Sequence, residues 1–154
     1  MTGTSEEEPA EHLRFWAYMS SLEQVAEADE AALVGDVLAD QDQAMAQSAV
    51  LLHLDRRAAE LCGGSGYEQW AAVMGPLAAG RPLLALRLTE WSLLRAIAMR
   101  EPVQADALIE ASNWLQLRAA ATPDPEVRAI LAEHGRTRRI RHTARAHSKK
   151  PGSR

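Results

Sequence analysis

The amino-acid sequence predicts an all-α fold, a single compact bundle of about six or seven helices without a β-sheet. Between successive Pro, Gly and Asp positions, apolar residues recur at three- and four-residue spacing, which is typical of helices packed on one side. Alternating runs of β-branched residues, which strands favour, do not occur. The length of 154 residues and the hydrophobic content of 47% suit one domain that folds without disulfides or metal.

Three helices are expected in the first third of the chain. Pro9 suits the first turn of a helix over residues 9–27, because the missing N–H of proline costs little there. Asp29 is placed to cap a second, short helix, and a third runs from Asp42 to Leu61. The apolar stripe of the first helix consists of Phe15, Trp16, Met19, Leu22 and Val25.

The middle of the chain carries clear start and stop signals. Ser65 and Glu68 have the spacing of a capping box, which predicts a helix from Gly66. The pair Gly75-Pro76 is expected to kink or end that helix. Gly80 suits the C-terminal cap, and Pro82 the first turn of the next helix.

The helix from Pro82 is apolar around most of its circumference, which predicts a central position in the bundle. Pro102 opens a further helix. The run Asp124-Pro125-Glu126 combines a capping carboxylate, a first-turn proline and an acidic first turn, so it predicts another start. Gly135 is expected to end that helix.

Charge divides the chain into two regions. The first 134 residues hold nine basic and 21 acidic residues, a net charge of −12, whereas residues 135–154 carry eight basic residues and no acidic one. We therefore expect an acidic disordered N-terminus over 1–8, a helical domain over 9–134, and a basic C-terminal arm over 135–154 that is partly helical or disordered. No signal peptide or membrane-spanning run is visible, which favours a cytoplasmic location.

Recognisable catalytic motifs are missing from the sequence, so neither an enzyme, a cofactor nor a metal site is predicted. No Glu-x-x-His pair occurs, and Cys62 is the only cysteine. The stretch "CGGSG" follows a helix and lacks the lysine of a phosphate loop. His53 is expected to be a partly buried imidazole bonded to a neighbouring carbonyl or carboxylate. Asp55 is not its partner, because residues two apart point to different helix faces.

Two interpretations of function follow, and both involve the ends of the chain. The first is a small cytoplasmic protein–protein interaction or adaptor module that binds a protein partner or itself. The alternative is a nucleic-acid-associated protein whose arm contacts the phosphate backbone; an enzyme with a dispersed site ranks third. If residues 137–147 are helical, Ile140 and Ala144 form the apolar side of the arm. The candidate partner-binding residues are Phe15, Trp16, Tyr18, Arg136, Arg138, Arg139, Arg141, Arg145, Lys149 and Lys150.

Overall fold

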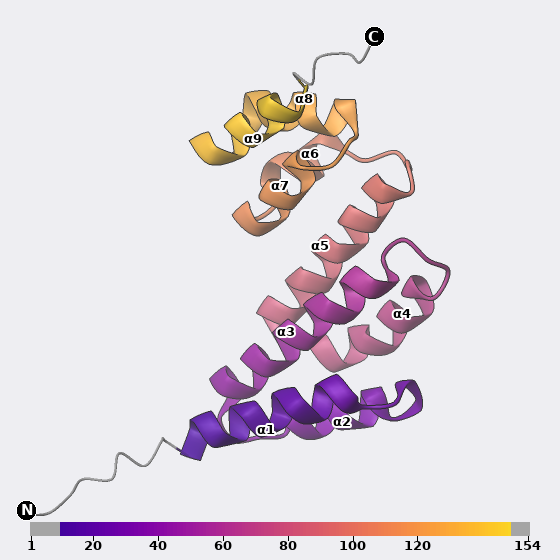
Figure 1. Ribbon diagram of the computed structural model, residues 1–154, viewed down its shortest axis with the longest axis vertical. Helices are drawn as coiled ribbons and strands as arrows, with labels where there is room; N and C mark the ends of the chain where they lie inside the picture. Colours follow the sequence, from indigo (N-terminus) through magenta and orange to yellow (C-terminus); the bar gives the residue numbers. More distant parts are fainter. Residues whose placement is uncertain (1–9, 149–154) are drawn as a thin grey trace, which may run out of the picture. The chain divides into compact units, whose positions relative to one another are not determined.

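The structure, a computed structural model, describes residues 10–148 and confirms the all-α class. These residues form nine α-helices and one 3₁₀ turn, and no strand occurs among them (Figure 1). The predicted acidic segment 1–8, Lys149 and Lys150 lie outside the described residues. The predicted count of six or seven helices is wrong for two reasons: the segment after Pro102 forms two helices, and the basic arm contains another.

The chain divides into two compact units, which we describe separately. Within the described residues, the N-terminal unit comprises 10–61 and 65–88, and the C-terminal unit comprises 62–64 and 89–148. The helix α5 (Pro82–Ala98) contributes residues to both units. No helix among residues 10–148 is both long and apolar enough to cross a lipid bilayer.

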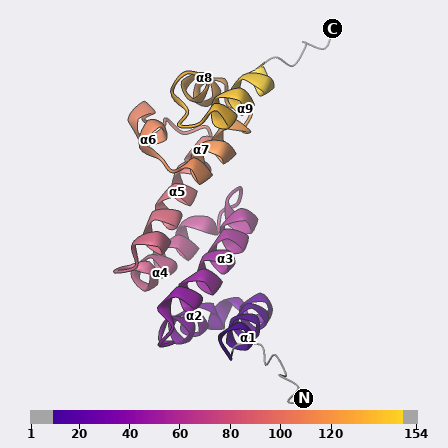
Figure 2. The same ribbon diagram turned by 90° about the vertical axis from the view of Figure 1, so that its left-hand side faces the viewer.

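The N-terminal unit contains α1 (Ala10–Gln24), the 3₁₀ turn η1 (Glu27–Asp29), α2 (Glu30–Leu38), α3 (Gln43–Leu61) and α4 (Tyr67–Ala78). Both views show α1 and α2 beside the lower part of α3, and these three helices contact one another (Figures 1 and 2). The first helix ends at Gln24 rather than at residue 27, because the chain turns into η1. The buried core residues of these helices include Leu22, Val34, Val37, Ala46, Ala49, Leu54, Tyr67, Trp70 and Met74.

The helix boundaries of this unit show which start signals act as expected. Asp42 caps α3, since its Oδ1 accepts a hydrogen bond from the backbone N of Met45 at 3.0 Å. Asp29 precedes α2 as expected, but its side chain makes no capping hydrogen bond. Gly66, rather than Ser65, occupies the N-cap position of α4. That helix continues through Pro76 to Ala78, so it does not end at the proline.

The C-terminal unit contains the second half of α5 together with α6 (Ala105–Glu110), α7 (Asn113–Ala120), α8 (Pro125–His134) and α9 (Arg138–Ser148). A single helix was expected after Pro102, but the chain breaks at Ser112 because a buried carboxylate holds it there. Glu90 of α5 accepts hydrogen bonds from Ser112 N at 2.9 Å and from Ser112 Oγ at 2.6 Å. The same hydroxyl oxygen accepts from Leu115 N and thereby caps α7.

Gln116 joins three segments of the C-terminal unit, and its side chain is fully buried. Its Nε2 donates to the carbonyl oxygens of Leu108 at 2.8 Å and of Ile109 at 3.0 Å, at the end of α6. Its Oε1 accepts from the backbone N of Arg136 at 2.9 Å, in the turn between α8 and α9. A buried amide with these partners fixes the turn relative to α6, since any displacement would leave a buried polar group unpaired.

Helices α8 and α9 pack closely across Gly135. Asp124 caps α8 as predicted, accepting from the backbone N atoms of Glu126 and Val127. Gly135 ends α8 as predicted, but with φ of −54°, so left-handed backbone is not the reason for the glycine. A Cβ atom there would lie 2.6 Å from the carbonyl oxygen of Leu131 and 2.8 Å from Cγ2 of Ile140. The glycine is needed because the two helices leave no room for a side chain.

Gly135→Ala is expected to lower the free energy of unfolding by about 1–3 kcal/mol, because the added methyl group overpacks this contact. Gly63→Ala is the matched control, since a Cβ atom at residue 63 would meet no atom within 4 Å. We expect the control to stay within about 0.5 kcal/mol of the wild type in urea denaturation. Equal stabilities of the two variants would contradict the close approach at Gly135.

Candidate functional site

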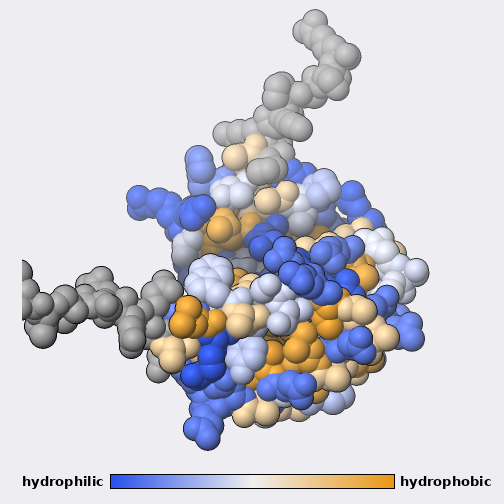
Figure 3. Space-filling view, turned by 60° about the horizontal axis from the view of Figure 1, so that its bottom comes forward, coloured by the Kyte–Doolittle hydropathy of each residue, from blue (hydrophilic) through white to orange (hydrophobic). Residues whose placement is uncertain are grey.

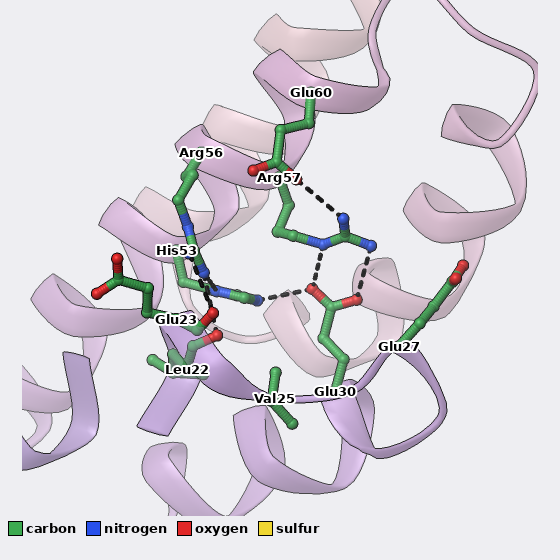
Figure 4. A pocket seen from close by; sticks show the side chains of 9 residues that line it. All are labelled: Leu22, Glu23, Val25, Glu27, Glu30, His53, Arg56, Arg57 and Glu60. Atoms are coloured by element: carbon green, nitrogen blue, oxygen red, sulfur yellow. Dashed lines mark hydrogen bonds and ion pairs between the residues drawn. The ribbon is translucent and has the colours of Figure 1, made fainter. Parts of the chain in front are cut away.

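A buried carboxylate organises the N-terminal unit. Glu30, the first residue of α2, has a side chain that is 3% exposed. Its Oε2 lies 2.7 Å from Nε2 of His53, 2.9 Å from Nε of Arg57 and 3.2 Å from Nε1 of Trp70. Figure 4 shows His53 and Arg57 reaching this carboxylate from α3. We refer to Glu30, His53, Arg56, Arg57 and Trp70 as the Glu30 cluster.

The hydrogen bonds of His53 determine its tautomer. Nη2 of Arg56 lies 3.0 Å from Nδ1 of His53. A guanidinium group can only donate, so Nδ1 accepts and carries no proton. The proton of the neutral imidazole is therefore on Nε2, which donates to Glu30. Both ring nitrogens are occupied, so in this arrangement neither is free to act as a general base.

Arg56 also connects α3 to the end of α1. Its Nη2 donates to the carbonyl oxygen of Leu22 at 3.0 Å, and its Nη1 lies 3.5 Å from the carbonyl oxygen of Glu23. These carbonyl groups belong to the last turn of α1, which has no further helical donors. A cation at this end also interacts favourably with the helix dipole. The cluster therefore fixes where α1 ends.

The ionisation states of the cluster follow from its geometry. Burial by itself raises the pKa of Glu30, but hydrogen bonds from Arg57, His53 and Trp70 outweigh burial and hold the pKa below its ordinary value. Burial lowers the pKa of His53, and the neighbouring guanidinium groups lower it further, so the attraction of Glu30 is not sufficient to offset them. The native cluster thus contains an ionised Glu30, a cationic Arg57 and a neutral His53.

A cavity of about 220 Å³ opens beside the Glu30 cluster. Leu22 and Val25 contribute apolar walls, and three further glutamates line it. Of these, Glu60 accepts from Nη1 of Arg57 at 3.1 Å. The hydrogen bonds within the Glu30 cluster stabilise its buried charged groups, since its donors and acceptors bind one another. The glutamates lining the cavity, apart from Glu30, are Glu23, Glu27 and Glu60.

Most of this cluster was not identified from the sequence. Hydrogen bonding of His53 to a carboxylate is confirmed. Asp55 pairs with Arg87 of α5, in agreement with the expectation that it is not the partner of His53. Arg56 and Arg57 of α3 had no predicted role, yet both are half-buried. Their partners outside α3 include Glu30, 27 residues from Arg57, and Leu22, 34 residues from Arg56, so local spacing contains no signal for those contacts.

The three aromatic candidates of α1 lie on different sides of the helix. Trp16 is 63% exposed, and Phe15 packs edge-on against it with ring centroids 5.4 Å apart. Tyr18 faces inward: its hydroxyl group donates to Oδ2 of Asp40 at 2.7 Å, and this bond raises the pKa of Tyr18. Asp40 also binds the guanidinium group of Arg14 at 3.2 Å. Tyr18 therefore holds α1 in place, whereas Trp16 faces solvent.

A stripe of uncharged residues runs along the solvent-facing side of α1. Trp16 and the 59% exposed Leu13 are the two most exposed large apolar side chains among residues 10–148. The neighbouring positions at helical spacing are small or neutral, and all of them are exposed. On the molecular face shown in Figure 3, hydrophobic residues lie in clusters bordered by hydrophilic ones (Figure 3). We call this side of α1 the outer stripe; it consists of Leu13, Trp16, Ala17, Ser20 and Gln24.

Three arginines of the basic arm bind backbone carbonyl groups within the C-terminal unit. Arg136 donates to Ala111 O at 3.2 Å, Arg141 to Gly135 O at 2.7 Å, and Arg145 to Ala132 O at 2.9 Å. The side chains of Arg138 and Arg139 are exposed and pair with no other residue of the described range. In the same helix, Ile140 and Ala144 are buried. The arm therefore docks on its own unit through an apolar side and several arginines.

Comparison of the chain with protein families, with curated proteins and with solved structures finds no match. Within residues 10–148, no three His, Cys, Asp or Glu side chains are grouped so that they could hold a metal ion.

Replacing Glu30 with alanine is expected to lower the free energy of unfolding by about 3–5 kcal/mol, because Arg57, His53 and Trp70 lose their shared acceptor inside the protein. Glu27→Ala is the control, since Glu27 is exposed and lines the same cavity. It should change stability by about 0.5 kcal/mol or less. Urea denaturation followed by tryptophan fluorescence measures the free energy of unfolding of both variants. Similar decreases in the two variants would contradict a structural role for the buried carboxylate of Glu30.

The stability of the wild type is expected to fall between pH 7 and pH 5 more steeply than that of His53→Gln. The folded-state pKa of His53 lies below its ordinary value of 6.5, so the unfolded chain takes up this proton more readily as the pH falls through that value. Folding stability from this group is thus present above pH 6.5 and is lost on acidification. The measurement is the urea midpoint of the wild type and of His53→Gln at about pH 7, 6 and 5. The same pH dependence in both proteins would contradict a lowered pKa of His53 in the folded state.

Proposed function

We propose that this chain is a small helical protein–protein interaction module whose docking surface is the outer stripe of α1. The observation that carries the proposal is the exposure of Trp16 and Leu13, one helical turn apart, on a helix that is already packed on its other side. Burying a large apolar side chain contributes about 1.5–3 kcal/mol. Leaving two of them in water is unfavourable unless a partner covers them.

The composition of α1 supports the same conclusion. A helix on the surface of a globular protein normally carries charged residues opposite its buried stripe. On α1 the side opposite Leu22 instead carries the outer stripe, which has no charged residue. Tryptophan is among the residue types most enriched at the energetic centres of protein interfaces. The small side chains of Ala17 and Ser20 beside Trp16 would let a partner helix approach closely.

The basic arm is the weaker candidate for a partner contact. Arg136, Arg141 and Arg145 bind carbonyl oxygens of their own unit, which leaves Arg138 and Arg139 as the arginines of the described arm whose side chains have no such bond. Binding of the nucleic-acid backbone by counterion release depends on the number of available cations. Arginines that already bind carbonyl oxygens keep their charge but have fewer N–H groups for phosphate oxygens, which supports the protein-interaction proposal over phosphate-backbone binding.

Site-specific photo-crosslinking in the cells from which the gene derives tests the docking surface. Benzoylphenylalanine replaces Ala17, within the outer stripe, or Ala59, an exposed alanine of α3, as the matched control. We expect a discrete covalent adduct from position 17, either with the same chain or with one other protein. We expect no such adduct from position 59, and Trp16→Glu should abolish the adduct from position 17.

Equal adduct patterns from positions 17 and 59 would contradict the proposal, as would a position 17 adduct that is unchanged by Trp16→Glu. Urea denaturation of the Trp16→Glu variant shows whether loss of the adduct reflects lost binding or unfolding. At protein concentrations too low for association, the variant should be as stable as the wild type, because residue 16 is exposed.

A further inference from the structure

We propose that the occupant of the outer stripe is a second copy of this chain, paired with α1 in antiparallel orientation about a two-fold axis. The inference rests on the proposed function, since it names the partner of the same surface. Two features of α1 favour it: the distribution of large and small side chains along the stripe, and the positions of the polar residues that flank the stripe. The acidic character of the rest of the N-terminal unit is a third.

The shape of the outer stripe is self-complementary in one orientation only. The bulky side chains, Leu13 and Trp16, lie towards the N-terminal end of the stripe, Ala17 lies next to its midpoint, and the small Ser20 and the polar Gln24 lie in its C-terminal half. Parallel pairing would oppose large with large and small with small. Antiparallel pairing places the large side chains of each copy against the small ones of the other, which fills space at both ends of the contact.

The flanking charges are arranged for the same pairing. His12 and Glu23 are both exposed and border the stripe on one edge, because eleven residues are close to three helical turns. In an antiparallel two-fold pair, equivalent edges of the two helices face each other. With the axis between residues 17 and 18, His12 of each copy lies opposite Glu23 of the other. This places an imidazole, which can donate a hydrogen bond, beside each carboxylate and opposes no like charges.

The opposite edge adds no repulsion. Arg14 borders the stripe there, and its guanidinium group is bound by Asp40 of the same copy at 3.2 Å. Under the same pairing, Arg14 lies opposite Ser21, which is uncharged. Elsewhere in the described part of the N-terminal unit, acidic residues outnumber basic ones, so two copies repel over most of this surface. The outer stripe is a surface of the unit where a second acidic copy can approach without that cost.

Analytical ultracentrifugation of the purified full chain tests the inference. We expect a reversible dimer whose dissociation constant rises at least about tenfold in Trp16→Glu, because a carboxylate replaces the central apolar contact of each copy. The control is Leu83→Glu, which places the same charge on a similarly exposed apolar residue of α5. The control variant should dimerise like the wild type.

Charge reversal separates this geometry from any other apolar association. His12→Glu is expected to weaken the dimer about tenfold, since it puts two glutamates opposite each other at both ends of the contact. Adding Glu23→Lys to that variant should restore at least the wild-type affinity, because the facing side chains at positions 12 and 23 then carry opposite charges. A double variant as weak as His12→Glu would overturn the antiparallel register.

The outcomes for the two proposals are distinguishable. A wild-type chain that stays monomeric at the highest measurable concentration overturns the self-association. If photo-crosslinking at position 17 then yields an adduct with another protein, the interaction function stands and only the identity of the partner is overturned. A monomer that also forms no adduct at position 17 overturns both.

Discussion

The carboxylate of Glu30 is the constraint on which the N-terminal unit depends. It is almost completely buried at the start of α2, and α3 and α4 supply its three donors. An ionised carboxylate is tolerated in the interior only when it is paired and hydrogen-bonded, so His53, Arg57 and Trp70 must occupy these positions. Through Arg56, which binds both His53 and the carbonyl group of Leu22, the same constraint extends to the end of α1.

The C-terminal unit also contains buried polar side chains, but their partners differ. Here buried polar side chains bind backbone groups at helix ends instead of other charged side chains. Glu90 holds the break before α7, and Gln116 connects the end of α6 to the turn before α9. In both units, long-range polar contacts determine where helices stop. Apolar packing then fills the interior around those fixed points.

Local signals in the sequence were sufficient for most of the helices and for several of their ends. Asp42 and Asp124 cap their helices because the interaction of a carboxylate with first-turn N–H groups involves only neighbouring residues. The break at Ser112 escaped prediction, since it depends on Glu90, 22 residues earlier. The Glu30 cluster was not predicted for the same reason: its members come from α2, α3 and α4, and their burial depends on partners in other helices. The exposed Trp16 was found as a candidate, but Tyr18 was not separable from it without knowing that Asp40 lies opposite.

The contacts on the inner side of α1 have a consequence for recognition at its outer side. Tyr18 and Arg14 bind Asp40 near the middle of the helix, and Arg56 binds its last turn. The backbone that carries Trp16 is therefore already ordered before any partner arrives. A binding surface on a flexible segment loses conformational entropy when it engages, whereas the docking surface proposed here would lose little beyond the rotamer freedom of the exposed side chains. The backbone entropy of α1 is lost when the chain folds and not when a partner binds. Most of the free energy gained from contacts with even a short apolar stripe would therefore contribute to affinity.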